Sequence, residues 1–250
     1  MGKLILLTWL FCYILNTISG AELPGDVQKC SFGNSTCLVR SINTLIKLHP
    51  KGIPAIGLPP LDSYHFPDTV VLDSPNRPIY LNFNMRDNVN KGFENTTVTH
   101  VEGFLREPNQ KQILIKAHLP RLLHLATYDL EGRWLFCHKT SGTLQSDFQD
   151  FRVTLTLKVI LEYRNNKRYL KVYDLVPSIY LGRWIIWFDD LFKENFDLTV
   201  AMNAVFNRHW VEFWNELHPG LKKSFSNGFT TILNRVFENV AYDDMFLPDR

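Results

Sequence analysis

The chain has 250 residues, of which 45% are hydrophobic and 21% charged, a balance that indicates a globular protein rather than a disordered one. The formal net charge of +2 at pH 7 is too small to favour a nucleic-acid partner. The 18 phenylalanines, 6 tryptophans and 9 tyrosines provide enough aromatic side chain to fill a large core or to line a cavity.

The first 20 residues have the pattern of a secretory signal peptide. Lys3 supplies a positive charge, residues 4–15 are almost wholly apolar, and Ser19, Gly20 and Ala21 are the small residues that cleavage requires. The apolar run is shorter than the roughly 20 residues that span a bilayer, so an uncleaved membrane anchor is disfavoured. We expect a secreted, extracellular protein without stable membrane insertion, and a single domain over residues 21–250.

In a secreted protein, cysteines can form disulfides and sequons can be glycosylated. Cys30 and Cys37 flank a short loop, and an oxidising compartment favours a disulfide between them over two free thiols. Cys137 has no evident partner and is expected to be a buried free thiol. Asn34 and Asn95 each begin an N-x-T sequon, so both are candidate glycosylation sites. Asn95 is the better acceptor, because the cysteine loop around Asn34 is tight.

A short amphipathic helix is predicted after the signal peptide. Apolar residues share one face over residues 38–46, with Ser35 or Thr36 as the expected N-cap. Pro50 ends this helix, and residues 51–61 are rich in proline and glycine. We therefore expect an extended connector between the helix and the segments that follow.

The middle of the chain has the period-two alternation of β-strands. Strands are predicted at residues 79–86, 96–105, 111–119, 152–163 and 169–176. Asn165-Asn166 lies between the last two and predicts a tight hairpin turn. No helical pattern separates these segments, so the sheet should be antiparallel. The length of the last two strands favours strong curvature.

From residue 198 to residue 240 the apolar period is helical. Pro219-Gly220 is expected to break or kink this helix into two legs. The second leg carries an aromatic stripe that needs a partner, and only β-type sequence lies upstream. We therefore predict an α+β fold in which a curved sheet wraps a long helix and can hold a lipid. The predicted cavity residues are Leu38, Ile42, Ile46, Phe225, Phe229, Ile232, Leu233 and Val236, with helix–sheet packing as the alternative role for each.

No catalytic or metal-binding signature is present. The sequence has no G-x-S-x-G, H-E-x-x-H or C-x-x-C motif and no phosphate-binding glycine loop. His209 is expected to be a partly buried histidine with a hydrogen-bond partner rather than a ligand or base. The pairs Asp189-Asp190 and Asp243-Asp244 have no second functional group beside them. We expect a protein that is not an enzyme and that has no metal and no cofactor.

Over the whole mature sequence, the order and spacing of several short motifs are similar to those of one family. These motifs are Cys30 and Cys37, Lys51-Gly52-Ile53-Pro54, Leu58-Pro59-Pro60-Leu61, Asp87-Asn88-Val89, Gly103-Phe104, Asn203, Trp210, Asn215-Glu216-Leu217, Tyr242-Asp243 and Phe246. The chain resembles the insect juvenile hormone-binding protein and takeout family. The resemblance implies a long helix wrapped by a strongly curved antiparallel sheet that encloses a hydrophobic tunnel.

The resemblance also implies a function, the carriage of a small hydrophobic ligand in extracellular fluid. Candidate ligands are a juvenile-hormone-like terpenoid, a fatty acid or another long-chain lipid. Hormone-binding members commonly have a second disulfide late in the chain, for which Cys137 has no partner. This departure favours the takeout-like branch, which is linked to circadian, feeding and chemosensory physiology.

The sequence is also compatible with two alternative functions. The first is a membrane-docking lipid-transfer protein, which needs an exposed basic or aromatic patch near the tunnel mouth. Lys167-Arg168 and Arg183-Trp184 are the candidate docking residues. The second is an extracellular signalling protein that has a structural lipid and an unknown protein receptor.

Overall fold

The computed structural model describes residues 20–73, 80–133 and 137–248. Residues 1–19, which make up nearly all of the predicted signal peptide, lie outside the described residues. The helices are α2 (Ser35–Leu48), α3 (Phe196–Arg208) and α4 (Trp210–Asn239). The strands are β1 (Tyr64–His65), β2 (Thr69–Asp73), β3 (Tyr80–Lys91), β4 (Thr97–Glu102), β5 (Ile113–Arg133), β6 (Cys137–Arg164), β7 (Lys167–Tyr180) and β8 (Arg183–Phe188).

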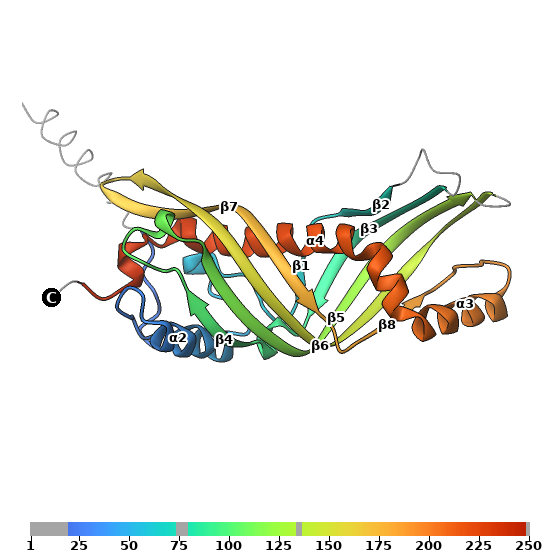
Figure 1. Ribbon diagram of the computed structural model, residues 1–250, viewed down its shortest axis with the longest axis horizontal. Coiled ribbons are helices and arrows are strands. Elements are labelled where there is room, and N and C mark those ends of the chain that lie inside the picture. The colour runs from blue at the N-terminus through green and yellow to red at the C-terminus, as the bar shows by residue number, and fades with distance from the viewer. Residues whose placement is uncertain (1–19, 74–79, 134–136, 249–250) are drawn as a thin grey trace, which may run out of the picture.

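The strands form one curled antiparallel sheet that packs along α4, while α2 and α3 lie at opposite ends of the molecule (Figure 1). The central order is β1-β3-β5-β6-β7, with β2 paired to β3, β4 to β5 and β8 to β6. The predicted α+β class, with a strongly curved antiparallel sheet around a long C-terminal helix, is confirmed.

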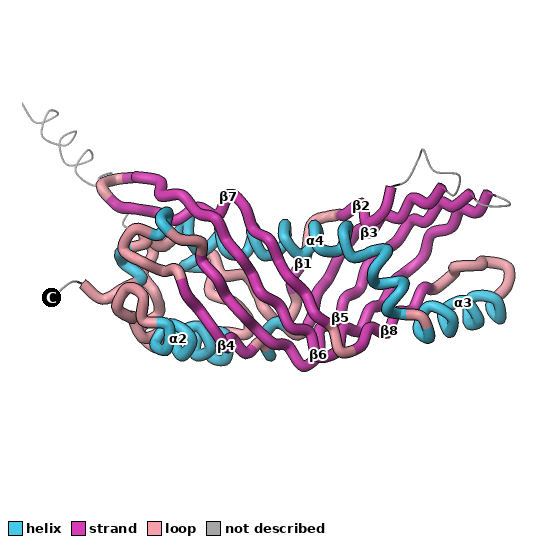
Figure 2. The backbone as a smooth tube through the Cα atoms, viewed as in Figure 1, coloured by secondary structure: helices cyan, strands magenta, loops and turns pink. Residues whose placement is uncertain are grey.

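Two long strands, β5 and β6, run through the whole molecule and divide it into two halves. Their pairing passes from Leu119 opposite Phe151 to Arg121 opposite Gln149, and it skips Pro120 and Asp150. Proline has no N–H to donate, and Asp150 has a φ of 50°. Figure 2 shows the long strands bending near the middle of the molecule.

We name the two halves after the helix at each end. In the α2 half, β4 and β7 flank the parts of β5 and β6 formed by residues 113–119 and 151–164. In the α3 half, β3 and β8 flank residues 121–133 and 137–149. Each half therefore has its own stretch of interior, although the two central strands are shared.

The hairpin at Asn165-Asn166 is confirmed. Both asparagines have positive φ, 51° and 61°, and Arg164 pairs with Lys167, as in a two-residue turn. The two strands predicted at residues 111–119 and 152–163 are longer than expected, because β5 continues to Arg133 and β6 begins at Cys137. In these added parts some inward positions are polar, such as His124, Thr140 and Ser146, so the alternation of apolar and polar residues is interrupted.

Two helix predictions need correction. The N-cap of α2 is Asn34, whose side chain accepts a hydrogen bond from the Cys37 amide, rather than Ser35 or Thr36. In the C-terminal region the helix breaks at His209, with φ −108° and ψ 37°, while α4 continues through Pro219.

The expected change of direction remains, because Figure 1 shows α4 bending near its α3 end. Gly220 has a packing role in this region. A Cβ atom at Gly220 would lie 1.9 Å from the Val71 carbonyl oxygen, so only glycine lets β2 approach the helix this closely.

Asparagine side chains from the helices bind the exposed edges of the sheet. Each of β4, β7 and β8 has one neighbouring strand, so its free edge presents unpaired backbone groups. In each contact the side-chain amide bonds both the N–H and the C=O of one strand residue, at 2.7–3.0 Å. The pairs are Asn43 with Val98, Asn203 with Phe188, Asn207 with Ile186, and Asn234 with Val172.

The predicted disulfide between Cys30 and Cys37 is present, with the Cα atoms 5.8 Å apart. Cys137 begins β6, and its side chain lies outside the described part of the chain, so the expected buried thiol stays a prediction. Among the described residues, no helix has both the length and the apolar character needed to cross a membrane.

Candidate ligand cavity

A cavity of about 300 Å³ lies in the α2 half, between α2, the sheet and the second leg of α4. This volume is at the lower end of the range typical of small-molecule pockets. The described residues that line it include two polar ones, Ser41 and Thr96, and none that is charged. The described lining residues are Leu23, Val27, Leu38, Ser41, Ile42, Leu45, Ile46, Ile56, Leu58, Leu61, Phe93, Thr96, Val98, Phe104, Ile115, Ala117, Leu119, Val153, Leu155, Phe229, Ile232, Leu233, Val236, Phe237, Met245 and Phe246.

The structure brings most of the predicted cavity residues together around this space. From α2 these are Leu38, Ile42 and Ile46, and from α4 they are Phe229, Ile232, Leu233 and Val236. Phe225 is the exception. It is 4% exposed, does not border the cavity, and packs against Phe148 and Phe151 with ring centroids 6.0 and 5.3 Å away.

Sequence reasoning missed the strand residues of the cavity wall. Ile115, Leu119, Val153 and Leu155 alternate with outward residues, so their inward direction was readable from the period of two. Which part of the interior is hollow depends instead on the side chains that face these strands from α2 and α4. That information is not contained in any one segment.

One end of the cavity is closed by the C-terminal segment, which contributes Met245 and Phe246 to the lining. Phe246 forms a parallel bridge with Cys30 of the disulfide. Tyr242 is fully buried, its hydroxyl donates to the Leu105 carbonyl oxygen at 2.6 Å, and burial raises the pKa of this hydroxyl. These contacts hold the segment against the rest of the wall.

Arg168 anchors the same segment from the β6–β7 hairpin. Its guanidinium contacts Asp243 at 2.5 Å and Glu107 at 2.9 Å, and its side chain is only 17% exposed. Its hydrogen bonds to Asp243 are the main reason that the pKa of that carboxyl is lowered. The neighbouring Lys167 pairs with Asp244 at 2.7 Å.

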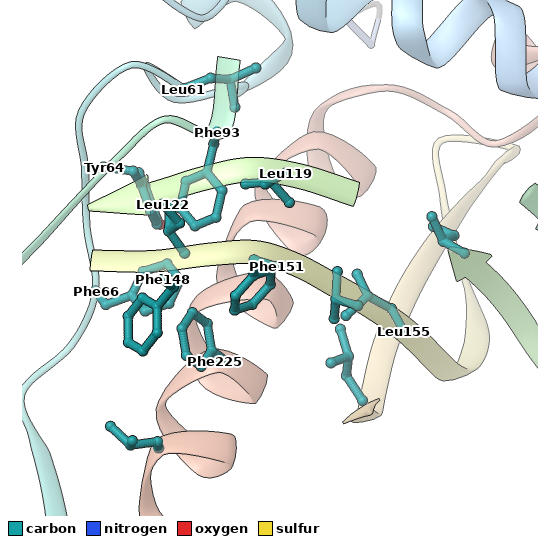
Figure 3. Packing of buried hydrophobic residues seen from close by; sticks show 14 of the residues in the cluster. Leu61, Tyr64, Phe66, Phe93, Leu119, Leu122, Phe148, Phe151, Leu155 and Phe225 are labelled. Carbon is teal, nitrogen blue, oxygen red and sulfur yellow. The ribbon is translucent and has the colours of Figure 1, made fainter. Parts of the chain in front are cut away.

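The inner end of the cavity meets four phenylalanines, which we call the aromatic block: Phe66, Phe93, Phe225 and Phe229. Phe93 and Phe229 border the cavity, and Phe66 and Phe225 lie behind them. Five of the ring pairs within the block have centroids 5.8–6.0 Å apart. Figure 3 shows Phe66, Phe93 and Phe225 with further buried rings between the strands and the helix.

Beyond the aromatic block, the described aromatic residues of the α3 half pack ring against ring. Trp184 is 2% exposed and stacks between Phe148 and Phe213, at 5.8 and 5.5 Å. Phe188 meets Tyr128 edge to face at 5.1 Å. The expected hydrophobic interior is therefore hollow in one half and packed with aromatic rings in the other.

A buried histidine lies in this packed half. His124 faces inward from β5, and its Nε2 lies 3.0 Å from the Asn88 Oδ1. Because the Asn88 amide nitrogen donates to the carbonyl oxygens of Pro67 and Met85, its Oδ1 accepts, which places the imidazole proton on Nε2. Burial lowers the pKa of His124 to about 4, so the ring is neutral at pH 7.

The two dipeptides considered for membrane docking do not form exposed patches. Lys167 and Arg168 are paired with the carboxylates described above. Trp184 is buried, and Arg183 bonds the Asn207 carbonyl oxygen at 2.7 Å and lies over the Trp210 ring.

Other candidate residues lie at the surface. The sequon residues Asn34 and Asn95 are both exposed. His209 is also exposed, with a side-chain exposure of 60%, which corrects the expectation of partial burial. No group of three or more metal-ligating side chains occurs within the described segments.

The fold and its cavity together define a class of protein: an α+β molecule in which a curled sheet and a long helix enclose an apolar space whose described lining residues carry no charge. The chain belongs to the haemolymph juvenile hormone binding protein (JHBP) family, whose model matches residues 6–247. This confirms the resemblance seen in the sequence. The family is one of carriers of small lipophilic ligands.

Individual relatives agree with this assignment. The chain is 23% identical to the circadian clock-controlled protein daywake of Drosophila yakuba, over 97% of this chain and 96% of that protein. It is 20% identical to the daywake protein of Drosophila melanogaster, over 96% and 94%. The crystal structure of Takeout 1 from Epiphyas postvittana shares the fold, with a TM-score of 0.72 and 17% identity over 86% of this chain and 97% of that one.

Proposed function

We propose that this protein is a secreted, takeout-like carrier that encloses a small lipophilic ligand in the cavity of the α2 half. The observation that carries the proposal is the lining, in which Ser41 and Thr96 are the polar members and no described residue is charged. Each methylene group that leaves water for such a site contributes about 0.8 kcal/mol. An acyl or isoprenoid chain can therefore bind without a charged partner when the cavity is already formed.

Three ligand classes fit this carrier function: a juvenile-hormone-like terpenoid, a fatty acid and another long-chain lipid. The description of the family supports the first class. The lone Cys137 and the similarity to Takeout 1 and daywake support the takeout-like branch. We extend the proposal to a role in rhythmic physiology, since daywake is named as clock-controlled. A transcript level that stays constant through the day would argue against that role.

Secretion, glycosylation and domain structure are parts of the same proposal. The N-terminal pattern around Lys3 supports cleavage after residue 20, and the exposure of Asn34 and Asn95 supports glycan attachment. We further propose that residues 21–250 fold as one domain. Intact mass of the secreted protein tests cleavage and glycans, and a single cooperative unfolding transition tests the domain.

The first experiment is native mass spectrometry of protein from a eukaryotic secretion system, followed by solvent extraction. A lipophile bound at one to one is the expected result, and its mass identifies the ligand class. An apo mass, with no later uptake of juvenile hormone, terpenoid or fatty-acid probes, would overturn the carrier proposal.

A variant separates binding from folding. Phe229→Trp adds volume to a side chain that borders the cavity, so it should weaken ligand uptake more than it lowers the free energy of unfolding. The matched control is Phe213→Trp in the α3 half, which does not border this cavity. Equal loss of uptake in both variants would show that uptake does not depend on the cavity.

A further inference from the structure

The cavity has a definite length because it is blind at its inner end. It begins near the C-terminal segment and stops at Phe93 and Phe229, the two members of the aromatic block that border it. Its volume is about 300 Å³. An apolar cavity of about 150 Å³ is large enough to bind one benzene molecule, which has six carbon atoms. A space of twice that volume therefore accommodates about ten to twelve non-hydrogen atoms.

The aromatic block is held in place by backbone as well as by ring contacts. The Phe66 amide donates to the Asn88 carbonyl oxygen at 2.9 Å, which fixes the segment before β2 against β3. The Phe66 ring packs directly against Gly228 of α4. A Cβ atom at this position would lie 2.4–2.6 Å from three atoms of the ring, so a larger residue would displace it. Phe225 is braced from behind by Phe151. A ligand chain cannot push past these rings without displacing a packed core.

Among the described lining residues, one side-chain hydroxyl is free to bind a ligand. The Ser41 hydroxyl already donates to the Gln28 carbonyl oxygen at 2.7 Å. The Thr96 hydroxyl makes no hydrogen bond with any described residue, although the Thr96 backbone N–H bonds the Phe93 carbonyl oxygen. Thr96 is therefore the group that can recognise an oxygen atom of a bound molecule.

We propose that the cavity selects a neutral lipophile of about ten to twelve non-hydrogen atoms, with the aromatic block as its length stop and Thr96 as the hydrogen-bond partner of its oxygen. This proposal rests on the carrier function proposed above and specifies its ligand. An alcohol, ketone or ester oxygen suits Thr96, which can donate or accept one hydrogen bond. A carboxylate does not suit the site, because burying an unpaired charge is costly and no described lining residue is cationic. Of the three ligand classes named above, this proposal therefore retains short neutral terpenoids and excludes fatty-acid carboxylates and long-chain lipids.

The test of length uses the full secreted chain and a series of 1-alkanols from eight to eighteen carbons, in competition with a fluorescent probe. The affinity should rise about fourfold per methylene up to about ten to twelve carbons and then stop rising. A fourfold gain that continues through eighteen carbons would overturn the length stop while leaving the carrier function intact. Failure of every alkanol and hydrocarbon probe to bind would instead defeat the carrier function.

Two variants test whether the aromatic block sets the length limit of the ligand. In Phe225→Leu the affinity should continue to rise to longer alkanols than in the wild type. The reason is that leucine is smaller than the phenylalanine ring that stacks on Phe229, so it leaves additional space at the inner end of the cavity. Phe188→Leu is the matched control, since Phe188 is equally buried but lies in the α3 half. An unchanged length limit in Phe225→Leu, or the same shift in the control, would show that the block does not set the length. The wild-type series alone keeps the proposal testable if either variant fails to fold.

The test of the hydroxyl uses Thr96→Val, which keeps the shape of the side chain and leaves the Asn95-Thr96-Thr97 sequon functional because the sequon requires only Thr97. This variant should bind 1-decanol about five- to tenfold more weakly and bind decane as the wild type does. The wild type should bind decanoate at least tenfold more weakly than decanol. Equal affinity of the two proteins for decanol, or tighter binding of decanoate, would overturn the proposed recognition.

Discussion

The two halves of this molecule share the strands β5 and β6 but have opposite interiors. In the α2 half the inward residues of these strands, such as Ile115 and Leu155, border an open space. In the α3 half the inward residues Tyr128 and Phe148 contact other aromatic rings. The backbone of a curled sheet therefore does not by itself make a cavity, since side-chain size decides which part stays hollow.

The terminal helices differ in the same way. Leu38, Ile42 and Ile46 of α2 point into the interior and form one wall of the cavity. In contrast, α3 uses Asn203 and Asn207 to bind the edge of β8. One helix thus covers the interior and the other protects a sheet edge, although both lie at an end of the same sheet.

The largest expected effect comes from the same truncation made in both halves. Phe188→Ala should lower the free energy of unfolding by about 3–5 kcal/mol, because Phe188 is 2% exposed and surrounded by rings. Phe229→Ala should cost at least 1 kcal/mol less, since Phe229 borders empty space on one side. Urea denaturation of the ligand-free proteins measures both values, and equal losses would contradict the contrast between the halves.

A slightly smaller effect concerns acid and is confined to the α3 half. The pKa of His124 is lowered from 6.5 to about 4 by burial, so between these pH values the unfolded chain binds a proton that the folded chain does not. Stability should therefore fall as the pH decreases from 6.5, by about 3 kcal/mol at pH 4.

A variant isolates this contribution from those of the carboxylates that titrate in the same range. His124→Gln retains a donor for the Asn88 Oδ1 but cannot take up a proton. The loss of unfolding free energy between pH 7.5 and 4.5 should be about 2–3 kcal/mol smaller in the variant than in the wild type. Parallel pH profiles would show that His124 is not the group responsible.

The smallest effects belong to the asparagine contacts at the sheet edges. Asn203→Ala leaves the buried N–H and C=O of Phe188 without partners and should cost about 2–3 kcal/mol. Asn43→Ala in the α2 half does the same to Val98 but at a partly exposed site, so about 1 kcal/mol is expected. Thermal unfolding of the two variants measures the loss of unfolding free energy in each. A larger loss in Asn43→Ala than in Asn203→Ala would contradict the prediction.

Several parts of the structure were accessible from the sequence because they depend on neighbouring residues. The Asn165-Asn166 turn needs only two residues that tolerate positive φ. The disulfide closes a short loop between Cys30 and Cys37. The apolar face of the helix was visible from its own spacing. A break or kink was predicted at Pro219-Gly220. Helix α4 does bend near its α3 end (Figure 1), but the break between α3 and α4 lies at His209, where no local signal marks it.

The family, the α+β class, the curvature of the long antiparallel strands and the apolar face that α4 buries were all predictable from the order of the residues. Three features depend instead on contacts across the fold: the position of the hollow part of the interior, the place of Phe225 in the aromatic block rather than in the cavity wall, and the position of Thr96 beside the cavity. The physical reason is that these features arise between residues far apart in the chain, such as Phe66 and Gly228. Local periodicity tells which way a side chain points, and the volumes of its distant neighbours decide whether it meets a ring or an empty space.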